Sequence, residues 1–88
     1  MGCVPFWAFL VFYAIVSRVS DRQKLLGMSI RKFRKQAKFS QEKLAEKADL
    51  HPVYIGKIER GEKWISLHAL LRIADALHIR ISDLVADL

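Results

Sequence analysis

The sequence predicts an all-α protein with one small domain of five helices and an apolar N-terminal extension. Apolar residues recur at the three- and four-residue spacing of helices in several segments. Serine and proline stand where helices are expected to begin, and glycine stands where one is expected to end. The 88 residues leave room for a single small core, which dimerisation would help to stabilise. We therefore expect an extension over residues 1–19 and a folded domain over residues 20–88.

The extension begins with a stretch that contains no charged side chain, MGCVPFWAFLVFYAIVS, over residues 1–17. As a helix it would be about 25 Å long against about 30 Å of membrane hydrocarbon, at the lower limit for a span. It lacks the basic start and the cleavage site of a secretory signal. Three interpretations remain open: a short membrane anchor or hairpin, a helix that packs on the domain or on a partner, and an extension produced by an upstream start codon. We prefer the last slightly and the anchor second.

The first helix of the domain is expected to run from residue 21 or 22 to Lys38, with Ser20 as its cap. Its apolar stripe crosses Met28, so the domain is expected to begin before this methionine. The stripe that should face the core consists of Leu26, Ile30, Phe33 and Ala37.

The next two helices are expected to share one tight turn. Ser40 should cap a helix over residues 41–48, and Phe39 should pack against that helix. His51 should open the following helix, because Pro52 suits its first position, and Gly61 should close it. Two short helices joined in this way form the supersecondary unit of many DNA-binding domains. The expected inward residues are Leu44, Ala45 and Ala48 on the first helix, Leu50 in the turn, and Ile55 and Ile58 on the second.

The last two helices are expected to complete the core. Ser66 should cap a helix over residues 67–77, and Ser82 should cap a short helix over residues 83–88. Asp83 would place a negative charge at the positive end of that last helix. The core residues of the longer helix are expected to be Leu67, Leu70, Leu71, Ile73, Ala74 and Leu77.

Two stretches, SQEKLAEKADL and YIGKIERG, resemble the Cro/cI-type (lambda-repressor-like, XRE-like) helix-turn-helix family. Within it the chain is most similar to small controller proteins of restriction-modification systems. The resemblance covers about Leu26 to Leu84. It implies a prokaryotic, five-helix, sequence-specific DNA-binding transcription regulator, such as a repressor, that binds a palindromic operator as a homodimer in the cytoplasm, associated with the nucleoid. The alternative is an antitoxin-like or membrane-tethered interaction protein that uses the same motif for autoregulation. Binding to a membrane through residues 1–17 is possible but is not the favoured interpretation.

The resemblance also assigns roles to residues. The second helix of the motif enters the major groove of double-stranded DNA. The base-reading candidates are His51, Val53, Tyr54, Gly56 and Lys57. The phosphate-contact candidates are Ser40, Gln41, Arg60, Lys63 and Trp64. Pro52 stands where relatives often carry a polar base-reading residue, so the base code of the family does not carry over directly.

Three further expectations concern packing. The family pairs an arginine at the position of Arg34 with a glutamate at that of Glu59; as ordinary surface charges the two would contribute only about 0.2–1 kcal/mol. His78 stands where relatives often have glycine, which predicts an adjusted helix end. The apolar residues Ile79, Ile81, Val85 and Leu88 exceed what a small core must bury and are expected to form the dimer surface.

The charge balance suits a polyanionic partner, since the formal net charge is +6 and basic residues dominate from Arg18 to Lys38. Cys3 is the only cysteine, which excludes an intramolecular disulfide and a cysteine-based zinc cluster. The sequence has no glycine-rich phosphate loop and no HExxH motif. We therefore expect no catalytic residue, no metal site, no cofactor and no enzyme activity.

Overall fold

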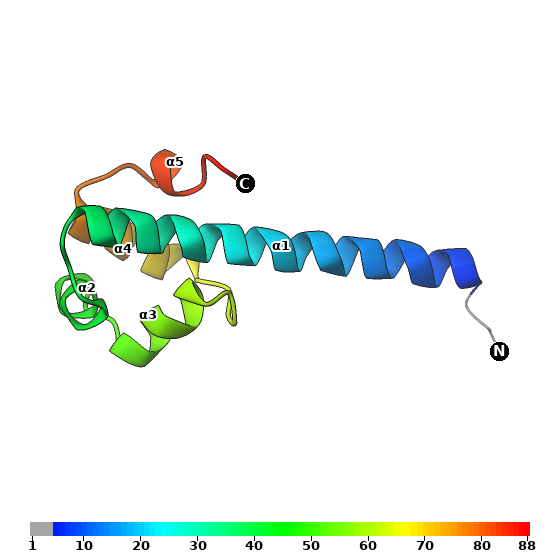
Figure 1. Cartoon of the computed structure of the whole chain (residues 1–88), viewed down its shortest axis with the longest axis horizontal. Helices are drawn as coiled ribbons and strands as arrows, with labels where there is room; N and C mark the ends of the chain where they lie inside the picture. The colour runs from blue at the N-terminus through cyan, green and yellow to red at the C-terminus, as the bar shows by residue number, and fades with distance from the viewer. Residues whose placement is uncertain (1–4) are drawn as a thin grey trace.

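The computed structural model describes residues 5–88, apart from the side chains of Val16 and Val19. Figure 1 shows a helical domain from which the first half of one long helix projects. The all-α class predicted from the sequence is confirmed. The helices in the described range are α1 (Phe6–Gln36), α2 (Gln41–Ala48), α3 (Pro52–Glu59), α4 (Leu67–Leu77) and α5 (Ile81–Leu84).

Helix α1 begins much earlier than the sequence suggested. It starts at Phe6, directly after Pro5, and continues without a break, so Ser20 lies inside the helix and is not its cap. The change of composition near residue 20 is a change in polarity, and no proline or glycine lies between Phe6 and Leu26 to interrupt the helix. The helix also ends earlier than residue 38, because Lys38 adopts a left-handed conformation with φ of 62°.

Helices α2 and α3 have the limits that their capping residues predicted. The Ser40 hydroxyl oxygen accepts a hydrogen bond from the amide of Lys43 at 3.0 Å. The His51 Nδ1 atom accepts one from the amide of Val53 at 3.1 Å, and Pro52 occupies the first turn. Gly61 follows α3 with φ of 73°, a conformation that glycine adopts at little cost. Local capping chemistry therefore sets both ends of the motif.

Helix α4 begins where predicted, since the Ser66 hydroxyl accepts a hydrogen bond from the amide of Ala69 at 3.1 Å. The expectation that Leu67 and Leu71 belong to the core is wrong, because both side chains are exposed. They are four residues apart and share the outer face of the helix. His78 ends α4 in a left-handed conformation with φ of 55°, the adjusted end that was expected.

Helix α5 differs from the prediction at both ends. It begins at Ile81, so Ser82 lies within the helix and does not cap it. The start is stabilised instead by the Asp83 carboxylate, which accepts a hydrogen bond from the amide of Arg80 at 3.1 Å. The helix ends at Leu84, and a turn occupies the last residues of the chain. A carboxylate three residues into the helix thus replaces the serine cap.

The core lies between the second half of α1 and helices α2, α3 and α4, with α5 closing it (Figure 1). Its largest fully buried side chains come from all five helices: Ile30, Leu44, Ile55, Ile58, Ile73 and Leu84. The first half of α1 contributes nothing to this core. None of the helices among residues 5–88 combines the length and the apolar character that crossing a bilayer requires.

Candidate nucleic-acid interface

The outer face of α3 carries the side chains best placed to meet a large partner. Ile55 and Ile58 point into the core, and Gly56 is also buried. Val53 and Lys57, one helical turn apart, are exposed on the opposite side. The helix therefore offers one apolar and one cationic side chain to whatever lies against it.

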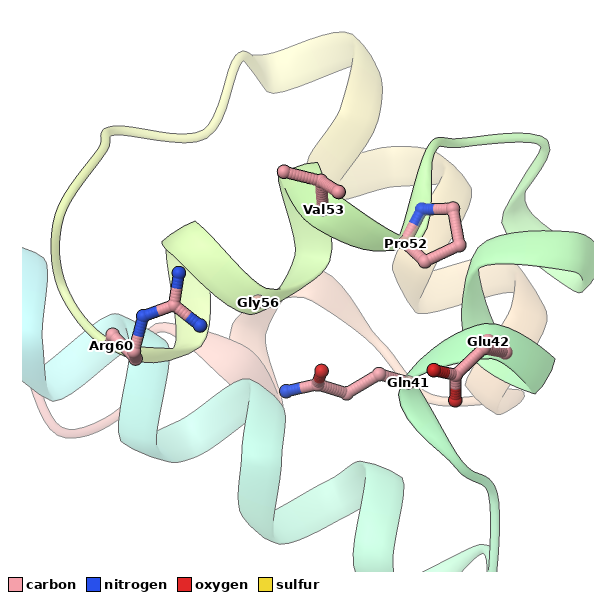
Figure 2. Close-up of a pocket in the computed structure, with 6 residues that line it drawn as sticks. All are labelled: Gln41, Glu42, Pro52, Val53, Gly56 and Arg60. Carbon is pink, nitrogen blue, oxygen red and sulfur yellow. The ribbon is translucent and has the colours of Figure 1, made fainter.

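A pocket lies between the start of α2 and the outer face of α3, as Figure 2 shows. It brings two predicted phosphate contacts, Gln41 and Arg60, together with two predicted base contacts, Val53 and Gly56. A Cβ atom on Gly56 would lie 3.0 Å from Nη1 of Arg60 and 3.5 Å from Oε1 of Gln41. Glycine at this position therefore leaves room for both polar side chains. The pocket lining is completed by Glu42 and Pro52.

A second pocket on this face shares Val53 with the first. It is lined by His51, Val53, Tyr54, Lys57 and Lys63. The Lys63 ammonium lies 5.3 Å from the centre of the Tyr54 ring, within the range of a cation–π contact. The two pockets together contain all five predicted base contacts and three of the five predicted phosphate contacts.

The other two predicted phosphate contacts, Ser40 and Trp64, line neither pocket. The Ser40 hydroxyl already caps α2, and Trp64 is part of the loop after α3, where its side chain is exposed. Phosphate contact by these two residues stays a prediction.

Two of the predicted base contacts also hold the fold together. His51 caps α3, as described above. The Tyr54 hydroxyl oxygen accepts a hydrogen bond from the amide of Ser66 at 3.2 Å and so connects α3 to the start of α4. Each side chain therefore has a structural role that does not need DNA, and base reading by these two residues stays a prediction.

Arg60 is held by an acidic neighbour on the surface. Its Nε and Nη2 atoms donate to the two carboxylate oxygens of Glu62 at 3.0 and 3.1 Å. These hydrogen bonds, with the charge of the guanidinium, lower the pKa of Glu62, and the Glu62 carboxylate raises the pKa of Arg60. A DNA phosphate would have to compete with Glu62 for Arg60.

Beneath the pocket lies a buried network that joins α1 to α3. Arg34 Nε donates to Glu59 Oε2 at 2.6 Å, and Nη2 donates to Oε1 at 2.9 Å. The remaining Nη1 donates to the carbonyl of Phe39 at 2.8 Å. The Gln41 amide nitrogen donates to Glu59 Oε1 at 3.2 Å, so one predicted phosphate contact is itself positioned by this pair. The pair is therefore an internal connection and not an ordinary surface contact.

Sequence reasoning missed two residues that fix α1 on α3. Gly27 lies where α1 crosses the end of α3, and a Cβ atom there would lie 2.3 Å from the carbonyl oxygen of Ile58. Gln23 donates from its side-chain amide to the carbonyl of Gly61 at 2.9 Å. A glycine in the middle of a predicted helix was the available signal for such a close approach.

No group of three or more histidine, cysteine, aspartate or glutamate residues among residues 5–88 is arranged to hold a metal ion. Cys3, which was expected to stand alone, lies outside the described residues.

Comparison with known proteins places these features in a family. Residues 30–84 match the family described as helix-turn-helix. The control protein C.SmaI of Serratia marcescens is 37% identical over 65 residues, which are 74% of this chain and 77% of that protein. The control protein C.BamHI of Bacillus amyloliquefaciens is 42% identical over 62 residues, which are 69% of this chain and 76% of that protein.

A solved structure of another controller protein is similar to this chain in fold. The restriction-modification controller protein C.AhdI of Aeromonas hydrophila superposes with a TM-score of 0.69 at 35% identity, covering 70% of this chain and 94% of that one. The family match begins at Ile30, so the first half of α1 lies outside it.

Proposed function

The chain belongs to the helix-turn-helix family and is a sequence-specific DNA-binding transcriptional regulator, and we propose that it binds a palindromic operator as a homodimer. The observation that supports operator binding is the outer face of α3, where the exposed Val53 lines both pockets and the exposed Lys57 lines the second. In the major groove, Lys57 would donate to guanine O6 and N7, and Val53 would pack on a thymine methyl group. The protein would bind its operator and regulate transcription in the cytoplasm.

The flanking polar groups support a division of roles. Gln41 at the start of α2 and Arg60 at the end of α3 lie beside Gly56 in the first pocket and would contact phosphates. Lys63 lies beside Tyr54 at the edge of the second pocket and would act as a further phosphate contact. Phosphate contacts set the position of α3, whereas Lys57 and Val53 would choose the sequence.

Two alanine variants test this division. Lys57→Ala should lower affinity for the best operator by about 1–3 kcal/mol and relax preference at one base pair, because a base contact is lost. Lys63→Ala should weaken binding to all sequences and flatten the dependence of log K on log salt by about one unit, because a phosphate contact is lost. Binding is measured on a randomised operator library at several salt concentrations. Equal effects from the two variants would overturn the division of roles.

The proposed dimer surface lies at the end of the chain. Ile79, Ile81 and Val85 are only half-buried against the core, and Leu88 is exposed. A two-fold dimer joined there would present two copies of α3 to successive major grooves, about 34 Å apart on the DNA.

Sedimentation measures this assembly directly. Leu88→Asp should shift the equilibrium towards monomer and weaken operator binding, since a charge would enter an apolar contact. Leu67→Asp is the matched control, because Leu67 is an exposed leucine outside the proposed surface. A dimer unaffected by Leu88→Asp, or equally sensitive to Leu67→Asp, would show that the surface lies elsewhere.

A further inference from the structure

The first half of α1 contains none of the residues proposed to contact DNA. We call its residues Phe6–Ile15 the apolar tip. Figure 1 shows this part of the helix, in blue, projecting beyond the domain. Eight large apolar side chains of the tip are between 50% and 76% exposed. No other part of the described chain leaves so many large apolar side chains uncovered.

The tip is apolar on every side. Successive residues of a helix are rotated by 100°, and the exposed side chains at positions 6, 7, 9 to 13 and 15 together surround the helix axis. None of the ten residues is charged. A helix of this kind needs an apolar environment on all sides. A second copy of the chain, or one face of another protein, would cover one side and leave the others in water, whereas lipid acyl chains would cover them all.

The length of the tip matches half of a bilayer. Ten helical residues extend about 15 Å, and the hydrocarbon core is about 30 Å thick, so the tip corresponds to one leaflet.

Basic residues begin at Arg18, three positions after the last residue of the tip. Arg18, Arg22 and Lys24 are exposed, and Asp21 is the only acidic residue among them. Arginine and lysine beside an apolar segment can reach lipid phosphates while their aliphatic stems stay in the apolar region. The segment therefore combines an apolar insert with a positive charge that complements an anionic leaflet.

We propose that the apolar tip inserts into one leaflet of an anionic membrane, with Arg18, Arg22 and Lys24 at the level of the lipid phosphates. The helix enters the bilayer without crossing it. The predicted DNA contacts lie on α2, α3 and the following loop and are separate from the tip. Membrane binding by the full chain is therefore independent of operator binding, and either can fail without the other.

The two tryptophans of the chain allow a direct test. Trp64→Phe leaves Trp7 in the tip as the only tryptophan, and Trp7→Phe leaves Trp64 in the domain. The full chain is mixed with phosphatidylcholine vesicles that contain or lack phosphatidylglycerol. Trp7 emission should shift to the blue with anionic vesicles and be quenched by brominated acyl chains, while Trp64 emission should not change.

Two other outcomes would overturn the proposal. A blue shift of Trp7 that appears without vesicles and disappears on dilution would mean that a second copy covers the tip. An unchanged Trp7 spectrum, with the protein left in the supernatant after vesicle sedimentation, would mean that the tip does not enter lipid.

Substitutions separate the apolar and electrostatic contributions. Phe9→Ser should lower the vesicle partition coefficient about tenfold or more, since a buried phenylalanine side chain is lost from the hydrocarbon. Arg18→Gln with Arg22→Gln should remove most of the preference for anionic over neutral vesicles. Leu67→Ser is the matched control, because it removes an exposed apolar side chain from the domain. An effect of Leu67→Ser equal to that of Phe9→Ser would contradict insertion through the tip.

Discussion

Replacing Arg34 with methionine should destabilise the domain far more than a surface arginine substitution would. The change keeps an unbranched side chain of similar length but removes both hydrogen bonds to Glu59 and the one to the Phe39 carbonyl. The Glu59 side chain is only 2% exposed, so its charge would remain buried with a single donor, the Gln41 amide. Loss of one partner of a buried ion pair costs about 3–5 kcal/mol.

That cost is large for a chain of this size. A native stability of about 0.05–0.15 kcal/mol per residue gives about 4–13 kcal/mol for the 88 residues. Arg34→Met should therefore remove a substantial part of the free energy of unfolding, measured by urea denaturation followed by circular dichroism. The double variant Arg34→Met with Glu59→Leu should recover most of the loss, because no charge then remains buried.

The chain contains its own control for this experiment. Arg60 and Glu62 form a bidentate pair of similar geometry on the surface. Arg60→Met should barely change stability, since water solvates the remaining carboxylate. If Arg34→Met costs no more than Arg60→Met, or if the double variant is as unstable as Arg34→Met alone, the argument from burial is refuted.

Three smaller changes test other contacts. Gly27→Ala should destabilise the domain by about 1–3 kcal/mol in urea denaturation, because the added Cβ meets the Ile58 carbonyl at the crossing of α1 and α3, and little or no loss would contradict that close approach. His78→Gly should raise the melting temperature, since glycine adopts the left-handed conformation at the end of α4 without strain; a lower melting temperature would mean that the imidazole makes a compensating contact. Glu62→Gln should tighten DNA binding, most at low salt, because Arg60 no longer has a competing carboxylate; weaker binding would show that Glu62 positions Arg60 for its contact.

The part of the fold that was predictable is the part fixed by local chemistry. Ser40, His51 with Pro52, and Gly61 act within one helical turn, so their pattern located α2 and α3. The start of α1 was wrongly predicted because polarity changes near residue 20 while helix propensity does not. Ser82 was wrongly predicted to cap the last helix, because serine often occupies that position. In the structure the Asp83 carboxylate accepts a hydrogen bond from the Arg80 amide and stabilises the start of α5 instead.

Contacts between distant segments were less accessible to sequence reasoning. The close approach at Gly27 depends on the angle at which α1 crosses α3, which no local pattern encodes. The exposed residues of α3 could be named because helical spacing separates them from Ile55 and Ile58. Two side-chain hydrogen bonds were not predicted, from Gln41 to Glu59 and from Arg60 to Glu62. Predicting them would have required the final positions of the side chains.

Because α1 is one continuous helix, the direction in which each side chain of its first half points is fixed relative to the domain. Because the helix is continuous from Phe6 to Gln36, inserting one residue after Ser17 would turn the far end by about 100° relative to α3, and inserting seven would nearly restore the original direction. A partner that reads a single side of the helix would respond to the first insertion and tolerate the second. Lipid has no preferred direction around the helix axis, so a leaflet would accept both.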